Sequence, residues 1–229
     1  MKNIYKTIVS LTCLSCAWSA HGAEFNFGYD TKYVSEGRNN LTDGGIIWAN
    51  LSSDIDEQIS WTVAYGIATA STVDYDELNV TISYANSHGT IDYYVDYTYL
   101  AFFEDDADDN EIGLGAAWQG LGAFTPFVDV VYSTESAGSF VQVGIQSQVQ
   151  TTQALSITPY LMLAYDFGYA SDAHDGYNHT AIGVTSNYVI NSEFSVSLFL
   201  EQTFGGTDVR VERGQSDQFW AGMRLHYGF

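Results

Sequence analysis

The feature that most constrains this chain is the strict alternation of apolar residues at its C-terminal end, "QFWAGMRLHYGF" (218–229). Every second residue is apolar, in the series Phe219, Ala221, Met223, Leu225, Tyr227 and Phe229. Successive side chains of a β-strand point to opposite faces, whereas the residues on one face of a helix recur every 3.6 positions. The segment therefore predicts a strand with one fully apolar face.

The same alternation recurs along most of the chain. Clear examples are 25–33, 59–67, 78–84, 91–99, 112–118, 157–165 and 194–200, and weaker ones are 45–53, 124–133, 139–150 and 179–190. In the first example, one face is expected to carry Phe25, Phe27, Tyr29 and Tyr33. Together with the terminal segment these patterns predict twelve strands, and no helical stretch of useful length is expected.

The connections between these strands alternate in length. Short ones (53–58, 86–89, 120–122, 150–153, 190–193) are interleaved with longer or more polar ones (35–45, 69–77, 104–111, 134–139, 166–179, 204–217). Short turns on one rim and long loops on the other are typical of outer-membrane barrels. A sheet in lipid must also close on itself, because no backbone group can be left without a partner.

These patterns predict an all-β fold, a transmembrane antiparallel up-and-down β-barrel of about 12 strands spanning residues 24–229. The alternative is a soluble β-sandwich or barrel, which also alternates. The many strands that contain Tyr or Trp favour the membrane protein, since these side chains suit the membrane–water interfaces.

The first 23 residues predict a secretory signal peptide. Lys2 and Lys6 precede an apolar stretch, and small residues lead to a cleavage site after Ala23, or alternatively after Gly22. A lipoprotein cleaved before Cys16 is a further alternative, although its lipobox is poor. Both cysteines lie in this segment, so no disulfide is expected in the barrel.

The charge balance excludes some partners. The chain has 28 acidic residues against seven Lys and Arg, and its net charge is −21. Such a chain is not expected to bind nucleic acid through its overall charge. Binding of cations or cationic solutes remains compatible with it.

The terminal segment resembles the C-terminal β-signal of Gram-negative outer-membrane proteins, in which alternating apolar residues end in an aromatic residue. The resemblance implies export to the outer membrane and recognition by the barrel assembly machinery. The residues that would form the assembly signal are Phe219, Met223, Leu225, Tyr227 and Phe229.

The segment "TKYVSEGRNNLTDGG" (31–45) resembles the first hairpin of a family of small porins, in which a Tyr-Val-x-x-Gly sequence leads to a Gly-rich loop. This chain has Ser35-Glu36-Gly37-Arg38 where members carry an aromatic residue, Arg and Gly. The resemblance implies a porin-like outer-membrane channel.

Polar residues between the apolar ones are expected to face the lumen. The candidate pore-lining residues are Asp92, Asp96, Asp129, Glu201, Arg224 and His226. Arg224 and His226 would form either a constriction facing carboxylates across the lumen or a structural ion pair. A mostly acidic lumen predicts a small channel for passive diffusion of small hydrophilic solutes, with a preference for cations.

Two other functions remain as alternatives. Bulky inward-facing residues would favour a closed barrel whose loops 166–179 and 204–217 bind a partner or have a structural role; the candidates are Trp48, Tyr94, Tyr160, Phe199 and Trp220. An outer-membrane hydrolase is disfavoured, because the chain has no His-x-Ser pair and only a polar loop at 171–179 that combines Asp with His. We therefore expect no catalytic residues and no cofactor.

The outer loops contain two weaker candidates for binding. Asp106, Asp108 and Asn110 echo the start of a calcium loop, but Glu111 and Ala117 replace its Gly and its final Glu. They predict either a solvated acidic loop or a weak divalent-metal site shared with lipopolysaccharide. Arg210 and Arg213 are expected at the outer rim, where they would contact either lipid A phosphates or a neighbouring acidic loop.

Overall fold

The computed structural model describes residues 22–171, 175–213 and 217–229, and most of the expected signal segment lies outside these ranges. Twelve long strands dominate it: β1 (Ala23–Asp30), β4 (Gly45–Asp54), β5 (Ile59–Thr69), β6 (Asp76–His88), β7 (Ile91–Phe102), β8 (Ala107–Trp118), β9 (Thr125–Ser133), β10 (Gly138–Gln146), β12 (Leu155–Phe167), β13 (Asp175–Val189), β14 (Phe194–Gly205) and β15 (Gln218–Gly228). The minor elements are β2 (Val34–Ser35), β3 (Arg38–Asn39), β11 (Val149–Gln150) and α1 (Thr207–Arg213).

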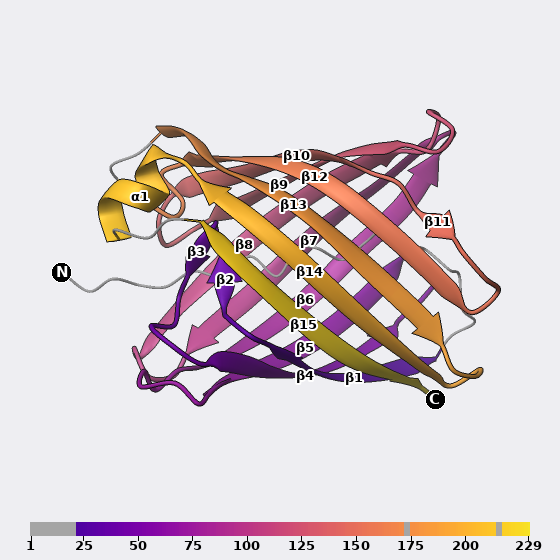
Figure 1. Cartoon of the computed structure of the whole chain (residues 1–229), viewed down its shortest axis with the longest axis horizontal. Helices are drawn as coiled ribbons and strands as arrows, with labels where there is room; N and C mark the ends of the chain where they lie inside the picture. The colour runs from indigo at the N-terminus through magenta and orange to yellow at the C-terminus, as the bar shows by residue number, and fades with distance from the viewer. Residues whose placement is uncertain (1–21, 172–174, 214–216) are drawn as a thin grey trace.

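Each long strand pairs antiparallel with the long strands before and after it, and β1 pairs with both β4 and β15. The pairing of β10 with β12 completes the ring, so the sheet has no free edge. Figure 1 shows the resulting tilted, closed barrel. The prediction of a twelve-stranded up-and-down antiparallel barrel is confirmed. No helix among the described residues is long and apolar enough to cross a membrane.

The outside of the barrel is apolar, as the alternation predicted. On β1, Phe25 and Phe27 are exposed, whereas Gly28 and Asp30 are buried. Exposed aromatic residues gather near both ends of the strands: Tyr29, Tyr65, Tyr99, Tyr132 and Tyr177 near one end, and Tyr84, Trp118, Phe124, Tyr188 and Phe229 near the other. An apolar band between two aromatic girdles is the surface that a bilayer requires.

The two ends of the barrel differ. The end with short turns also holds the C-terminus, where the backbone of Ala23 exchanges two hydrogen bonds with Phe229 at 3.0 Å each (Figure 1). In outer-membrane barrels this is the periplasmic end. The opposite, outer end carries α1 and the small β2–β3 hairpin.

The first outer loop departs from the expected arrangement. Strand β1 stops at Asp30, so Tyr33, expected on the outward face, is instead 4% exposed. The chain turns inward after Thr31, whose N–H still donates to the carbonyl of Ala221. The hydroxyl of Tyr33 then donates to Glu77 at 2.6 Å. The prediction for Tyr33 is therefore wrong, because alternation does not show where a strand ends.

Candidate functional site: the barrel interior

The outer end of the barrel is covered by segments that fold back over it. Buried residues of this cover occur in Tyr33–Leu41, in Tyr169–Ser171 and at Asp208–Val209 on α1. We call these three segments together the outer cap. The first comes from the loop after β1, the second from the loop after β12, and the third from the loop after β14.

The first segment of the outer cap is a tight hairpin. Val34 pairs with Asn39 and Ser35 with Arg38, which leaves Glu36 and Gly37 as a two-residue turn. Both turn residues have positive φ, 47° and 73°, as a two-residue turn of type I′ requires. A Cβ at Gly37 would lie 2.8 Å from the His179 ring, so glycine lets the hairpin tip approach β13 closely.

Apolar packing also anchors the first segment of the outer cap to the barrel wall, at strands β4 and β7. Tyr33 and Leu41 belong to a buried cluster whose further members are Ile46, Trp48, Tyr75, Leu100 and Phe102. The rings of Tyr33 and Trp48 meet edge to face at 6.0 Å. The hairpin therefore reaches from this cluster on β4 and β7 to His179 on β13.

Arg38 joins the three segments of the outer cap. Its Nη1 donates to the carbonyl oxygen of Ala170 at 2.9 Å, and its Nη2 lies 3.6 Å from Oδ2 of Asp208. Asn178 on β13 also donates to Asp208, at 2.5 Å. Arg38 is the only Lys or Arg among the buried residues that the structure describes.

Tyr169 fixes the second segment. Its ring packs on Phe140 at 5.9 Å, and its hydroxyl donates to Glu111 on β8. Complete burial and the carboxylate of Glu111 raise the pKa of Tyr169 well above its usual value, so it stays a hydrogen-bond donor. The segment is thus tied to β8, three strands away from β12 around the barrel.

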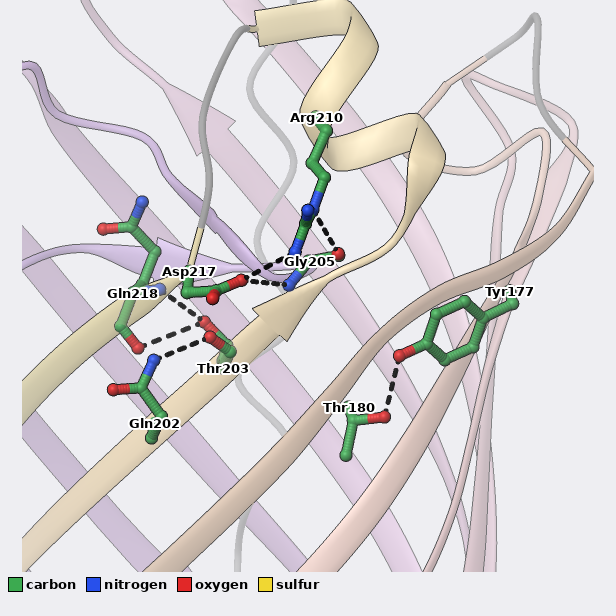
Figure 2. A network of polar contacts seen from close by, with 8 residues as sticks. All are labelled: Tyr177, Thr180, Gln202, Thr203, Gly205, Arg210, Asp217 and Gln218. Carbon is green, nitrogen blue, oxygen red and sulfur yellow. Dashed lines mark hydrogen bonds and ion pairs between the residues drawn. The ribbon is translucent and has the colours of Figure 1, made fainter.

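Arg210 on α1 is tied to the ends of its own loop rather than to the lumen. Figure 2 shows its Nε donating to the carbonyl of Gly205 at 2.9 Å and its Nη2 bound to Asp217 at 3.2 Å. Thr203 and Gln218 exchange two further hydrogen bonds of 3.3 Å at the base of this loop. The guanidinium of Arg210 remains 58% exposed, and the side chain of Arg213 lies outside the described residues.

Beneath the outer cap, the accessibility of the inner wall changes along the barrel. Inward-facing side chains in the outer half are buried, including Trp48, Leu100, Ala164 and Thr203. In the periplasmic half they are partly exposed, including Ser52, Ser83, Ser156 and Ser197. We call this accessible half, between the strand middles and the periplasmic turns, the periplasmic vestibule.

The carboxylates expected in the lumen lie on the inner wall. The hydroxyl of Tyr94 on β7 donates to Asp129 on β9 at 2.7 Å, and this contact passes over the intervening β8 inside the barrel. Asp96 occupies the next inward position on β7. Asp92 lies near the periplasmic rim, where it accepts hydrogen bonds from Ser87 at 2.5 Å and Gln119 at 2.9 Å.

Glu201 is the most enclosed of the predicted lumen residues, at 8% exposure. It accepts hydrogen bonds from the Tyr160 hydroxyl at 2.5 Å and from Nε1 of Trp220 at 3.1 Å. Tyr160 lies on β12, two strands away from β14, which carries Glu201. The side chain is thus held by partners from both sides.

Arg224 has its partner on the neighbouring strand and not across the lumen. Its two terminal nitrogens bind both oxygens of Asp30 on β1, at 2.5 and 2.7 Å. Its guanidinium also lies 5.9 Å from the centre of the Phe199 ring. This geometry matches the structural ion pair, which was one of the two alternatives for this residue.

His226 uses both ring nitrogens. Nδ1 lies 3.1 Å from Oε1 of Glu24 on β1, and Nε2 lies 2.8 Å from Oγ of Ser197 on β14. A sequence motif with nucleophile and base on one strand does not reveal this cluster, because three strands contribute to it. Only the pairing register of β1, β14 and β15 identifies it.

The bulky inward-facing residues do not simply fill the lumen. Four of them lie over a glycine that pairs with them on the adjacent strand: Trp48 over Gly66, Tyr94 over Gly115, Tyr160 over Gly183 and Phe199 over Gly222. In each pair a Cβ on the glycine would overlap the aromatic ring. The rings therefore lie against the wall, which is how aromatic residues cover glycines in sheets.

This arrangement makes Gly115→Val a test of the lumen width. We expect the added side chain to push the Tyr94 ring toward the lumen, to lower single-channel conductance and to cost about 1–3 kcal/mol of stability. Tyr94→Phe is the control, because it keeps the ring and loses only the hydrogen bond to Asp129. Unchanged conductance in a folded Gly115→Val barrel would show that the ring has no influence on the pore.

The expected divalent-metal residues do not form an enclosed site. Asp106 and Asp108 are exposed, and Oδ1 of Asn110 accepts a hydrogen bond from Tyr97 at 2.5 Å. Across the described ranges, no group of three or more His, Cys, Asp or Glu side chains is arranged to hold a metal ion. The geometry favours the solvated acidic loop, which was the other alternative.

Comparisons with known proteins define the fold. No family model matches the chain, and no curated protein matches its sequence. Among solved structures, the KdgM porin superposes with a TM-score of 0.63 at 10% identity, covering 90% of this chain and 99% of that chain. LpxR from Salmonella typhimurium gives 0.57 at 10% identity, covering 90% and 100%.

A third similar structure is the COG4313 outer membrane channel from Pseudomonas putida F1, with a TM-score of 0.55, 12% identity and coverage of 93% and 97%. At these identities the similarity establishes the fold alone. The chain has the fold of bacterial outer-membrane β-barrels, as the resemblance of its terminal strand implied.

Proposed function

We propose that the protein is a small porin-like channel of the Gram-negative outer membrane, through which small hydrophilic solutes diffuse passively. The observation that carries the proposal is the contrast between the two faces of the closed sheet. The outer face is apolar. The inner face carries polar and carboxylate side chains, and its periplasmic half, the periplasmic vestibule, is partly exposed.

The lumen should prefer cations. Asp96, Asp129 and Glu201 line it, whereas the guanidinium of Arg224 is neutralised by Asp30. Carboxylates near low-dielectric walls focus the electric field and raise the local concentration of cations. The names of the similar structures, which include a porin and an outer membrane channel, support transport as the general class of function.

The selectivity is tested by the reversal potential of the refolded protein in a planar bilayer under a salt gradient. We expect a cation-selective potential that moves toward zero in the double variant Asp96→Asn, Asp129→Asn, because two lumen charges are lost. Asp105→Asn, in the exposed loop after β7, is the matched control and should leave the potential close to that of the parent. An anion-selective parent would contradict the proposed preference.

A second candidate function is favoured by the outer cap. The buried residues of 33–41, among them Arg38, cover the outer end of the lumen. This arrangement suits a closed barrel that binds a partner through its loops or has a structural role. A folded barrel without conductance would favour this alternative and make loops 166–179 and 204–217 the next targets.

The proposed location also implies partners. The apolar band should contact outer-membrane lipid, and the barrel assembly machinery should recognise the C-terminal strand. Lipopolysaccharide is a further proposed partner at the outer rim, where the guanidinium of Arg210 is exposed. Export through the segment 1–23 is proposed on the sequence pattern alone.

A further inference from the structure

The contacts of His226 form a continuous hydrogen-bonded chain through the periplasmic vestibule. Glu24 Oε1 lies 3.1 Å from Nδ1, and Ser197 Oγ lies 2.8 Å from Nε2. With the ring proton on Nδ1, the imidazole donates to the carboxylate and accepts the serine hydroxyl proton. This is the connectivity of a nucleophile, a general base and an orienting acid.

The pairing register explains how three strands build this chain. The direct partners of His226 are Asn26 on β1 and Ser195 on β14, so Glu24 and Ser197 are diagonal neighbours. Diagonal neighbours in a sheet are within reach of long side chains. An imidazole placed between two such neighbours can use both nitrogens at once.

The chain of contacts is open to water. The side chain of Glu24 is 47% exposed and that of His226 is 25% exposed, and Ser197 is also partly exposed. This differs from the outer half of the lumen, where inward-facing side chains are buried. A small molecule that enters from the periplasmic end can therefore reach the serine.

We propose that Ser197, His226 and Glu24 form a hydrolytic site for small carboxylic esters that enter the barrel from the periplasmic end. Ser197 Oγ bonds to the ester carbonyl carbon while Nε2 of His226 takes the hydroxyl proton. The C–O bond to the alcohol then breaks, and His226 returns the proton to the leaving oxygen. His226 then deprotonates a water molecule, whose oxygen attacks the carbonyl carbon of the acyl-serine. The bond between Ser197 Oγ and that carbon breaks, His226 returns the proton to Oγ, and the free acid leaves.

The barrel also determines what stabilises the developing oxyanion. Backbone N–H groups in a closed sheet are committed to neighbouring strands, so they offer no oxyanion hole. Arg224 is the direct cross-strand partner of Ser197, which places a cationic side chain beside the nucleophile on the same inner face. Because this cation is already bound to Asp30, we expect slow hydrolysis.

The test is covalent labelling of the folded, heat-modifiable protein with a fluorescent fluorophosphonate, followed by peptide mapping. The Oγ–P bond forms, fluoride leaves, and His226 takes the hydroxyl proton. We expect one labelled residue, Ser197, and no labelling in Ser197→Ala or His226→Ala. Ser195→Ala is the matched control, since Ser195 is the direct cross-strand partner of His226 on the same strand as Ser197.

Glu24→Gln tests the positioning residue separately. We expect the maximal labelling rate to fall about tenfold or more while the half-saturating probe concentration is unchanged, because the amide favours the wrong imidazole tautomer. If Glu24→Gln lowered labelling only because the barrel folds poorly, the fraction of heat-modifiable protein would fall instead. A parallel assay with p-nitrophenyl acetate should show slow turnover that is lost in Ser197→Ala.

The proposal is overturned if the folded protein is labelled no more than Ser197→Ala, or if His226→Ala is labelled as fast as the parent. It is also overturned if the label maps to another residue. Because labelling is measured without a membrane current, its failure leaves the proposed channel untouched, and a silent barrel leaves this site untouched.

Discussion

Arg38→Ala is expected to lower the free energy of unfolding in detergent by about 3–5 kcal/mol, the usual cost of removing one partner from a buried ion pair. Asp208, which is 2% exposed, would keep its contact to the neutral Asn178, and the structure describes no other ion pair for it. The hairpin tip would also lose its bond to the carbonyl of Ala170. We therefore expect the outer cap to loosen and single-channel conductance to rise.

The matched control for this variant is Arg210→Ala. Its guanidinium is 58% exposed and its ion pair with Asp217 is at the surface, so its loss should cost less than about 1 kcal/mol. Conductance should stay at the parent level. An Arg38→Ala barrel with parental stability and conductance would show that the outer cap does not depend on this guanidinium.

Deletion of Phe229 is expected to remove most of the folded protein from the outer membrane of expressing cells. The terminal strand resembles the β-signal, and this resemblance implies that the barrel assembly machinery recognises Phe229. Phe229 is 63% exposed, lies on the lipid-facing side of the alternation, and its ring stacks on that of Tyr227 with 5.4 Å between the ring centres. The variant Phe229→Ala, which keeps the backbone bonds to Ala23, should show a similar loss in cells.

The control for the terminal residue is refolding in detergent without cellular machinery. Because the side chain is exposed, Phe229→Ala should refold to nearly the same yield as the parent and be only slightly less stable. Phe204→Ala, an exposed aromatic change at the opposite end of the barrel, should leave cellular assembly close to normal. Normal amounts of heat-modifiable Phe229→Ala protein in the outer membrane would refute the assembly signal.

The fold could be predicted from the sequence because lipid imposes one rule on every strand. Each outward position must be apolar, so residues such as Phe25 and Leu225 carry a period of two that is visible without any structure. The alternation of short and long connections then indicates the up-and-down order. Both patterns involve residues that are close together along the chain, so one sequence is enough to detect them.

The interior was harder to predict, because its contacts join distant parts of the chain. Tyr33 continues the alternation of β1, yet it lies inside the barrel, since the strand ends at Asp30. The contact between Arg38 and Asp208 joins two outer loops. Polar loops carry no periodic signal that would place them in the lumen.

The glycine pairs illustrate an intermediate case. Glycines such as Gly115 and Gly183 stand at inward positions and were visible in the sequence. Their role depends on register, because only the pairing shows that Tyr94 and Tyr160 lie over them. Alternation within a single strand predicts only that such rings point inward, not which residue of the next strand they cover. The contacts of His226 could not be predicted for the same reason, since they depend on the pairing register.

The most direct test of the proposed channel is the single-channel current of the refolded, heat-modifiable parent protein in a planar bilayer. We predict discrete, reproducible conductance steps, smaller than those of barrels with more strands, since lumen width grows with strand number. A correctly folded barrel that gives no steps, both as the parent and as Arg38→Ala, would contradict the channel and leave the loop-binding or structural barrel as the better account.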